Sequence, residues 1–424
     1  MTDIFKHIES AVQSYARAFP VIFTRAKGSH LYDEKGNAYL DFLAGAGTLN
    51  YGHNNPVLKK ALIDYIEQDG ITHGLDMHTG AKREFLENLD RFIFKPRAME
   101  YVVQFTGPTG TNAVEAAMKI ARNVTGRHNI VAFTNGFHGV SLGSMAATGN
   151  SHHRDAAGIP LTGVTHLPYA GYLGHELDTV KLLQQMIEDS SSGLDKPAAV
   201  MLETIQGEGG LNTASNEWLQ RIEALCRKHD ILLIVDDIQA GCGRSGRFFS
   251  FEESGIKPDL VTLSKSLSGY GLPFAVTLIK PEYDQWKPGE HNGTFRGNNH
   301  AFVTAAKALE HYWADDSFQL DVQKKIAHLS QRLQGIAKGF DRRLIHTKGR
   351  GFMQGLSFRD GEIAGAICRE AFDNGLIIET SGADNQVVKC LCPLTITIEE
   401  LDKGLDILQR AVNNTLKSQL RAAS

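Results

Sequence analysis

Short apolar runs alternate with helical patterns through the middle of the chain. Six runs predict strands: Tyr101–Phe105, Asn129–Phe133, Ala198–Glu203, Ile231–Asp236, Leu260–Ser264 and Phe274–Ile279. Between them, apolar residues recur every three or four positions, most clearly over Thr111–Arg122 and Glu217–His229, which is typical of helices with one buried face. Strands that alternate with helices indicate βαβ units, so we predict a mostly parallel sheet flanked by helices.

The two ends of the chain follow other patterns. Residues 1–20 place Ile4, Ile8, Val12 and Tyr15 at near-helical spacing and predict one amphipathic helix that ends at Pro20. The stretch His30–Phe42 predicts two short strands about a Gly-Asn turn.

A smaller domain with helices and strands is predicted after about residue 315. A long helical stretch is followed by three strand candidates and a closing helix: Leu320–Phe340, Gly351–Phe358, Leu376–Glu379, Val387–Leu391 and Ile398–Thr415. We therefore predict an α/β chain with an N-terminal segment (1–56) that contributes to the small domain, a large domain (57–315) and a C-terminal small α+β domain (316–424).

Composition narrows the class of protein. Of the 424 residues, 42% are hydrophobic and 22% are charged, which is ordinary for a soluble globular protein. A net charge of −4 argues against nucleic acid as a partner, and no apolar run approaches the roughly 20 residues that span a bilayer. The N-terminus lacks the apolar core of a signal peptide, and five cysteines without a disulfide framework suit a reducing compartment. We predict a cytoplasmic protein, and the scattered histidines predict no catalytic metal.

Lys265 is the first candidate catalytic residue. It follows the predicted strand Leu260–Ser264 and precedes a turn built around Gly269 and Gly271. Burial at a strand end disfavours the ammonium form and lowers the pKa of a lysine. Such a lysine can act as a nucleophile and form a Schiff base with a carbonyl group. The alternative is a lysine whose stem lies along apolar surface and whose charge reaches water.

Asp236 is the second candidate. It ends the strand Ile231–Asp236, whose five consecutive apolar residues indicate burial on both faces. Ligands of open α/β sheets bind at the carboxyl ends of the strands. A buried carboxylate there needs a cationic partner, such as the pyridinium nitrogen of pyridoxal 5′-phosphate (PLP). The alternative is an aspartate that caps the next helix.

The segment Asp236–Gly246, DDIQAGCGRSG, resembles the D-E-V-Q-T-G-x-G-R-T-G signature of the class III aminotransferases. Lys265 then falls where this family keeps its Schiff-base lysine. The resemblance runs from Leu31 to about Leu401, with the motifs in order. It implies PLP fold type I, PLP as the cofactor, and Lys265 and Asp236 as the catalytic residues. It also implies a homodimer or higher homo-oligomer with shared active sites.

The same resemblance implies which residues bind the cofactor. They are Thr109, Gly110, Thr111, Phe137, His138, Asp236, Ile238, Gln239, Lys265 and Thr294. The first three open a helix, where free N–H groups face an anion such as a phosphate. Phe137 would stack on the ring, Ile238 would pack on one ring face, and Gln239 would hydrogen-bond its phenolic oxygen. Thr294 would reach the phosphate of the neighbouring subunit, and Val140 replaces an arginine that the family usually has.

Three residues are implied to contact substrate: Glu208, Arg296 and Lys389. Glu208 takes the place of a glutamate that pairs with an arginine when glutamate is not bound. Lys389 stands where many family members have an arginine that binds the substrate α-carboxylate, so it keeps the charge but loses bidentate carboxylate geometry. Arg296 would lie close to an anionic substrate or form a salt bridge between subunits.

Three segments, Ile71–Thr79, Gly293–Asn299 and Val387–Leu394, resemble the family members that act in ectoine synthesis. The resemblance implies transfer of the amino group of glutamate to aspartate 4-semialdehyde, which gives 2,4-diaminobutyrate and 2-oxoglutarate. The alternatives are an ω-aminotransferase for ornithine or 4-aminobutyrate, a PLP-dependent aminomutase, and a PLP-binding protein without turnover. The expected partners are small-molecule amino acids, keto acids or semialdehydes.

Overall fold

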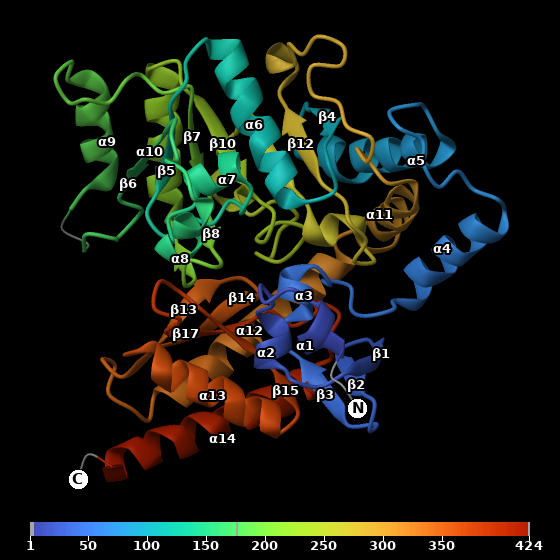
Figure 1. Ribbon diagram of the computed structural model, residues 1–424, viewed down its shortest axis with the longest axis vertical. Coiled ribbons are helices and arrows are strands. Elements are labelled where there is room, and N and C mark those ends of the chain that lie inside the picture. Colours follow the sequence, from blue (N-terminus) through green and yellow to red (C-terminus); the bar gives the residue numbers. More distant parts are fainter. Residues whose placement is uncertain (1–3, 175–176, 423–424) are drawn as a thin grey trace.

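The computed structural model describes residues 4–174 and 177–422 and consists of two parts (Figure 1). One part surrounds a large sheet, and the other is formed by the two ends of the chain, drawn in blue and red. No helix within the described ranges has the length and apolar character that crossing a membrane requires.

The large sheet has seven strands in the order β4-β12-β11-β10-β7-β5-β6. Their bounds are β4 Val102–Phe105, β5 Ile130–Phe133, β6 Val164–Leu167, β7 Ala199–Leu202, β10 Leu232–Asp236, β11 Leu260–Leu263 and β12 Val276–Ile279. Only β12 runs against its neighbours, so the predicted mostly parallel sheet is confirmed. The sequence prediction missed β6, whose residues are mostly half-buried and include a histidine and a threonine.

Helices cover both faces of this sheet, as a doubly buried strand requires. Leu232 and Ile234 of β10 belong to the core cluster that contains the apolar face of α6 (Gly110–Thr125). Leu233 and Val235 point the other way and join the core with α10 (Asn216–Lys228). Because side chains alternate along a strand, a continuous apolar run fills both layers.

The remaining helices around this part are α4 Pro56–Glu67, α5 Gly80–Leu89, α7 Leu142–Ala147, α8 Ser151–Arg154, α9 Thr179–Glu188 and α11 Asn299–Tyr312. A two-stranded ribbon, β8 Ile205–Gln206 and β9 Asn212–Thr213, follows β7. Its turn carries Glu208, so this predicted substrate residue lies on a loop.

The two ends of the chain build the second part together. One sheet joins β1 Phe23–Lys27, β2 His30–Asp33, β3 Ala38–Asp41 and β15 Leu376–Ile377, and the other joins β13 Ile345–Arg350, β14 Met353–Phe358, β16 Glu379–Ser381 and β17 Val387–Cys390. The helices are α3 Ala44–Gly47, α12 Ser317–Ala337, α13 Gly361–Asp373 and α14 Ile398–Ala422. The predicted N-terminal hairpin forms as β2 and β3. The predicted domain boundaries near residues 56 and 315 stay predictions.

The predicted strand Leu376–Glu379 is divided between the two sheets. Leu376 pairs with Leu40 of β3, whereas Glu379 pairs with Lys389 of β17. Ile378, which is buried, lies at the crossing. This change of sheet turns Glu379 toward Lys389.

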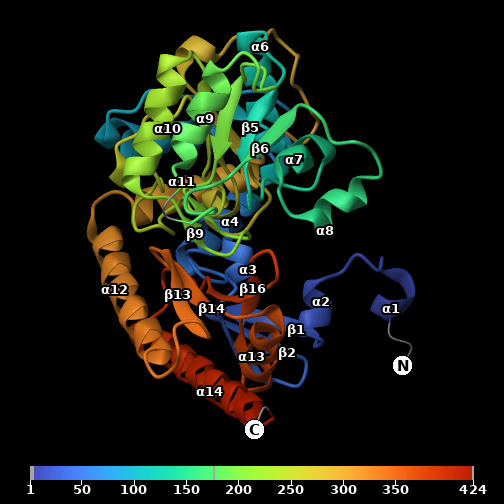
Figure 2. The ribbon, with the colours of Figure 1, turned by 90° about the vertical axis from the view of Figure 1, so that its left-hand side faces the viewer.

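The prediction of one N-terminal helix is wrong. The described residues form two short helices instead, α1 Ile4–Ile8 and α2 Tyr15–Ala18, and residues 1–3 lie outside the described part. Figure 2 shows α1 standing apart from the rest of the chain, and Ile8 is 73% exposed. Helices of this length depend on packing. Here no core lies beneath the apolar residues, and the Ser10 hydroxyl accepts from the backbone between the helices.

Candidate active site

Lys265 and Asp236 lie at the carboxyl edge of adjacent parallel strands. Asp236 is the last residue of β10, and Thr262 is its partner in register on β11. The Thr262 hydroxyl donates to Asp236 Oδ1 at 3.0 Å. Lys265 begins a 3₁₀ turn just after β11. The parallel register therefore brings the two predicted catalytic residues to one edge of the sheet.

The backbone of Lys265 is left-handed, with a φ of 49°. This conformation is uncommon for a residue with a side chain, and it is found at functional sites. The Lys265 Nζ donates to the carbonyl oxygen of Ala46 at 2.9 Å, so the N-terminal part of the chain contributes to the site. Burial lowers the pKa of Lys265, which favours the neutral amine that a nucleophile or general base needs.

Asp236 is held by a buried histidine. His138 Nδ1 lies 2.7 Å from Asp236 Oδ2, and both side chains are almost fully buried. Burial alone would lower the pKa of His138, but the hydrogen bond and the charge of Asp236 outweigh it and raise that pKa. The pair therefore fixes the orientation of the Asp236 carboxylate.

The start of α6 forms a cradle of small side chains. Thr109 caps the helix through a reciprocal contact with Asn112, and the Thr111 hydroxyl is 2.6 Å from that of Ser141. A Cβ added to Gly110 would come within 2.9 Å of Ile238 Cδ1, so a larger residue there would force the Ile238 side chain to shift. Free N–H groups at the start of this 16-residue helix suit a phosphate.

A buried amide lies beside this cradle and Lys265. Gln239 Nε2 donates to Ala46 O at 3.1 Å and to Glu208 Oε1 at 2.9 Å. Its Oε1 is buried and lacks a hydrogen-bond partner. Because buried polar atoms are almost always paired, this atom fits a site that holds a polar group such as PLP.

Phe137 and Ile238 flank the same region. The Phe137 N–H donates to Glu203 Oε2 at 3.0 Å, and its half-buried ring packs edge-on against His153 with centroids 5.4 Å apart. Ile238, also half-buried, adjoins Gly110. Their predicted roles on the two ring faces stay predictions.

The predicted substrate residues Glu208 and Lys389 are brought together. Lys389 Nζ lies 2.8 Å from Glu208 Oε1, and the lysine side chain is fully buried. Burial alone would raise the pKa of Glu208, but Lys389, with Lys265 beyond it, lowers that pKa to about 2. Burial alone would lower the pKa of Lys389, but the charges of Glu208 and Glu379 raise it, so Lys389 stays protonated.

Sequence reasoning missed two carboxylates at this site. Glu379 Oε1 lies 3.1 Å from Lys389 Nζ, and Glu203 accepts from the Phe137 backbone inside the core. Glu203 and Glu379 each end an apolar run, in Ala198–Glu203 and Leu376–Glu379. A carboxylate at the end of a buried run needs a partner, and this pattern could have identified both residues from the sequence.

Glu203 should make the stability of the apoprotein depend on pH. Burial raises the pKa of Glu203 from 4.5 to about 8. The unfolded chain releases this proton near pH 4.5, whereas the folded protein keeps it until about pH 8. The free energy of unfolding should therefore fall as pH rises through this window. Urea unfolding of Glu203→Gln should show a shallower decline. Asp237, whose pKa burial raises to about 7, contributes in the same direction, so some slope remains. An unchanged slope would contradict the buried neutral carboxyl.

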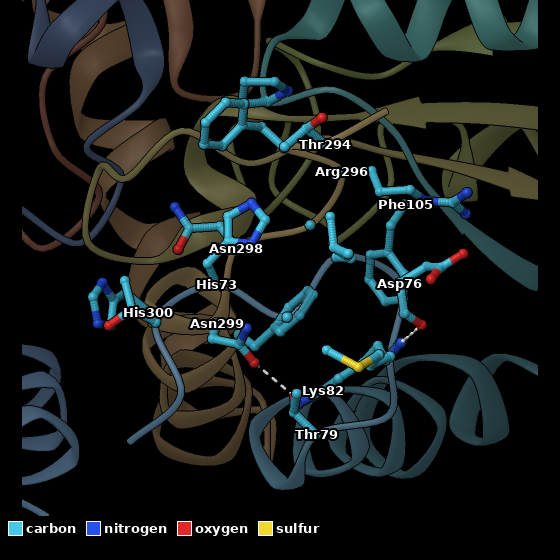
Figure 3. A pocket seen from close by; sticks show the side chains of 18 of the residues that line it. His73, Asp76, Thr79, Lys82, Phe105, Thr294, Arg296, Asn298, Asn299 and His300 are labelled. Atoms are coloured by element: carbon cyan, nitrogen blue, oxygen red, sulfur yellow. Dashed lines mark hydrogen bonds between the residues drawn. The ribbon is translucent and has the colours of Figure 1, made fainter. Parts of the chain in front are cut away.

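Thr294 and Arg296 do not join this cluster within one chain. They line a separate pocket of about 400 Å³ together with His73, Asp76 and Lys82 (Figure 3), and Lys265 is not among its described lining residues. Arg296 Nη1 donates to Asn292 Oδ1 at 3.1 Å, while its buried Nε lacks a partner. In the described part of the chain, no group of three or more His, Cys, Asp or Glu side chains could hold a metal ion.

Comparisons with known proteins agree on one family. The family model for class-III aminotransferases matches residues 11–412. The diaminobutyrate–2-oxoglutarate transaminase of Vibrio cholerae is 63% identical over 410 residues, which cover 97% of this chain and 99% of that protein. The protein of the same name from Halomonas elongata is 58% identical, with 96% and 98% covered. The structure of the ornithine aminotransferase from Toxoplasma gondii superposes with a TM-score of 0.85 at 25% identity, covering 98% of this chain and 94% of that one.

Proposed function

This chain belongs to the class III aminotransferases, and we propose that it transfers the amino group of L-glutamate to aspartate 4-semialdehyde, giving L-2,4-diaminobutyrate and 2-oxoglutarate. The cofactor is PLP. The placement of Lys265 beside Asp236 and His138 supports the reaction type. Relatives at 55–63% identity named diaminobutyrate–2-oxoglutarate transaminase support the substrates. We place the enzyme in ectoine synthesis and in the cytoplasm, where its free cysteines would stay reduced.

PLP, when bound, supplies an aldehyde that reacts with amines and a ring that accepts electrons from the substrate carbon. The Nζ of Lys265, with its lowered pKa, would take the proton from that carbon and return it on the cofactor side. Asp236, fixed by His138, would keep the ring nitrogen protonated. The backbone N–H groups at Gly110 and Thr111 would hold the phosphate.

Glu208 and Lys389 would adapt one site to two substrates. With an ω-amine bound, Glu208 stays on Lys389 and neutralises part of its charge. When glutamate binds, its carboxylate would replace Glu208 on Lys389. Glu208 suits this exchange because it lies on the turn between β8 and β9 rather than inside a strand.

We expect 2,4-diaminobutyrate to be a better reverse-direction donor than ornithine or 4-aminobutyrate. One methylene in a pocket is worth about 1–3 kcal/mol, so the preference over ornithine should be roughly 10- to 200-fold in kcat/KM. A donor screen with 2-oxoglutarate, followed by glutamate formation, measures it. A higher kcat/KM for ornithine or 4-aminobutyrate would support the other ω-aminotransferase reading. Turnover without a keto acid would indicate an aminomutase.

A homodimer with shared active sites would explain the separate pocket. Around it the chain exposes apolar side chains that a second copy would cover: Ile71, Leu75, Met77 and Phe295. In such a dimer Thr294 would contribute to the partner's phosphate site, which is the role that the family resemblance implies.

We therefore expect two impaired variants to complement each other. Lys265→Ala removes the catalytic amine, and Thr294→Asp places a like charge near the partner's phosphate. Refolding an equal mixture should restore about a quarter of the activity, because half of the dimers are mixed and each holds one intact site. Activity that never exceeds the sum of the two variants, or a fully active monomer in sedimentation experiments, would refute the shared site.

A further inference from the structure

Lys389 has two carboxylate neighbours, although one would satisfy its charge. Glu208 Oε1 lies 2.8 Å and Glu379 Oε1 3.1 Å from its Nζ. The two carboxylates reach the lysine from different elements. Glu379 is the cross-strand partner of Lys389 in the β16–β17 pair, whereas Glu208 comes from a turn. Burial raises the pKa of Glu379 against the opposing effect of Lys389. When both carboxylates are ionised, the cluster carries two negative charges and one positive charge.

The cluster lies next to the reacting centre, because Gln239 Nε2 donates both to Glu208 Oε1 and to the Ala46 carbonyl oxygen that also accepts from Lys265 Nζ. The charges of Glu379 and Lys265 are close enough that each shifts the pKa of the other group, after the larger effects of burial and of nearer charges. Burial, and then the charge of Glu379, raise the pKa of Tyr15, so the N-terminal segment also approaches the cluster. Glu379 Oε1 itself is buried and has an ion-pair contact but no hydrogen bond. A buried acceptor in this state fits a donor that arrives with a ligand.

The candidate substrates differ in charge at one carbon. 2,4-Diaminobutyrate, reacting through the amine on C4, carries a second ammonium group on C2 and has a net charge of about +1 near neutral pH. 4-Aminobutyrate has the same carbon chain and carboxylate but no amine on C2. When Lys265 is bonded to the cofactor, the net negative charge of the cluster favours 2,4-diaminobutyrate, because this substrate carries the additional ammonium group.

We propose that Glu379 is a specificity-determining residue whose carboxylate accepts a hydrogen bond from the C2 ammonium group of 2,4-diaminobutyrate. This inference rests on the proposed function. Glu379 suits the role better than Glu208 because its side chain is fixed on a strand and 11% exposed, against 31% for Glu208. Glu208 remains the carboxylate that leaves Lys389 when glutamate binds.

The test compares 2,4-diaminobutyrate with 4-aminobutyrate as donors to 2-oxoglutarate in the holoenzyme. Glu379→Gln keeps the size of the side chain and removes its charge. We expect kcat/KM for 2,4-diaminobutyrate to fall roughly 10- to 100-fold, as for a hydrogen bond between charged groups, while kcat/KM for 4-aminobutyrate stays nearly unchanged. The ratio of kcat/KM for 2,4-diaminobutyrate to kcat/KM for 4-aminobutyrate should therefore fall by about the same factor.

Two further variants separate this contact from a structural role. Glu379→Asp keeps the charge on a shorter side chain and should give an intermediate ratio, which also serves as the test if Glu379→Gln does not fold. Ser381→Ala alters the same strand without changing charge and should leave the ratio unchanged. A parallel loss for both donors would mean that Glu379 only braces Lys389.

The wild-type ratio keeps this inference separate from the proposed function. A wild-type enzyme that prefers 4-aminobutyrate would overturn the proposed substrate before any variant is measured. A wild-type preference for 2,4-diaminobutyrate that survives in Glu379→Gln and Glu379→Asp would overturn only the assignment of Glu379.

Discussion

Lys265→Ala should reduce transamination roughly 10⁴-fold, because both the covalent attachment of PLP and the proton-transferring amine are lost. The Nζ of Lys265 is the amine that the turn after β11 holds at the edge of the sheet with its pKa lowered by burial. Borohydride reduction of wild-type holoenzyme followed by peptide mapping should find the cofactor on the peptide that contains Lys265. Label on another lysine would refute the assignment.

Lys280→Ala is the matched control for that experiment. Lys280 also follows a strand of the large sheet, but it lies at the opposite edge and pairs with Asp259 at 2.8 Å. Its loss should lower stability and leave the cofactor attached. Equal losses of activity in both variants would mean that the effect of Lys265→Ala is structural.

Asp236→Asn should retain PLP but lose at least roughly 100-fold in kcat, since a neutral amide cannot keep the ring nitrogen protonated. The contacts at Gly110 and Thr111 would still hold the phosphate. Absorbance of the bound cofactor measures retention, and single-turnover reaction with glutamate measures the chemical step.

Asp237→Asn provides the comparison. Asp237 adjoins Asp236 and is fully buried, but it faces the other way and accepts from the Ser250 backbone. Burial raises the pKa of Asp237 to about 7, so in assays below that pH a neutral amide changes its charge little. Near-normal turnover in Asp236→Asn would show that Asp236 is only a structural carboxylate.

The parts of the fold with strong periodicity could be predicted from the sequence. The apolar run at Ile231–Asp236 fills both faces of a sheet, so its pattern alone identifies a central strand and the edge where a ligand binds. The prediction missed β6 because this half-buried strand contains polar residues and lacks a continuous apolar run. The N-terminal helix was predicted wrongly because the spacing of apolar residues identifies one face of a helix but not whether another element packs against that face.

The site was only partly predictable for a similar reason. The family resemblance implied Glu208 and Lys389 as substrate residues, but Glu379 meets Lys389 only because the chain changes sheets at Ile378. A contact of that kind depends on tertiary geometry that local sequence does not encode. Thr294 and Arg296 could not be placed for the same reason, because in the proposed dimer their neighbours would come from a second copy of the chain.

The pairing of β3 with β15 has a consequence for protein synthesis. The first strands leave the ribosome early, but the partner of β3, Leu376–Ile377, is made near the end. Until then the edge of β3 stays open to other chains. Ala46, whose carbonyl oxygen accepts from Lys265, belongs to the same early segment. A nascent chain stalled before Leu376 also lacks Glu379 and Lys389, so its site is incomplete.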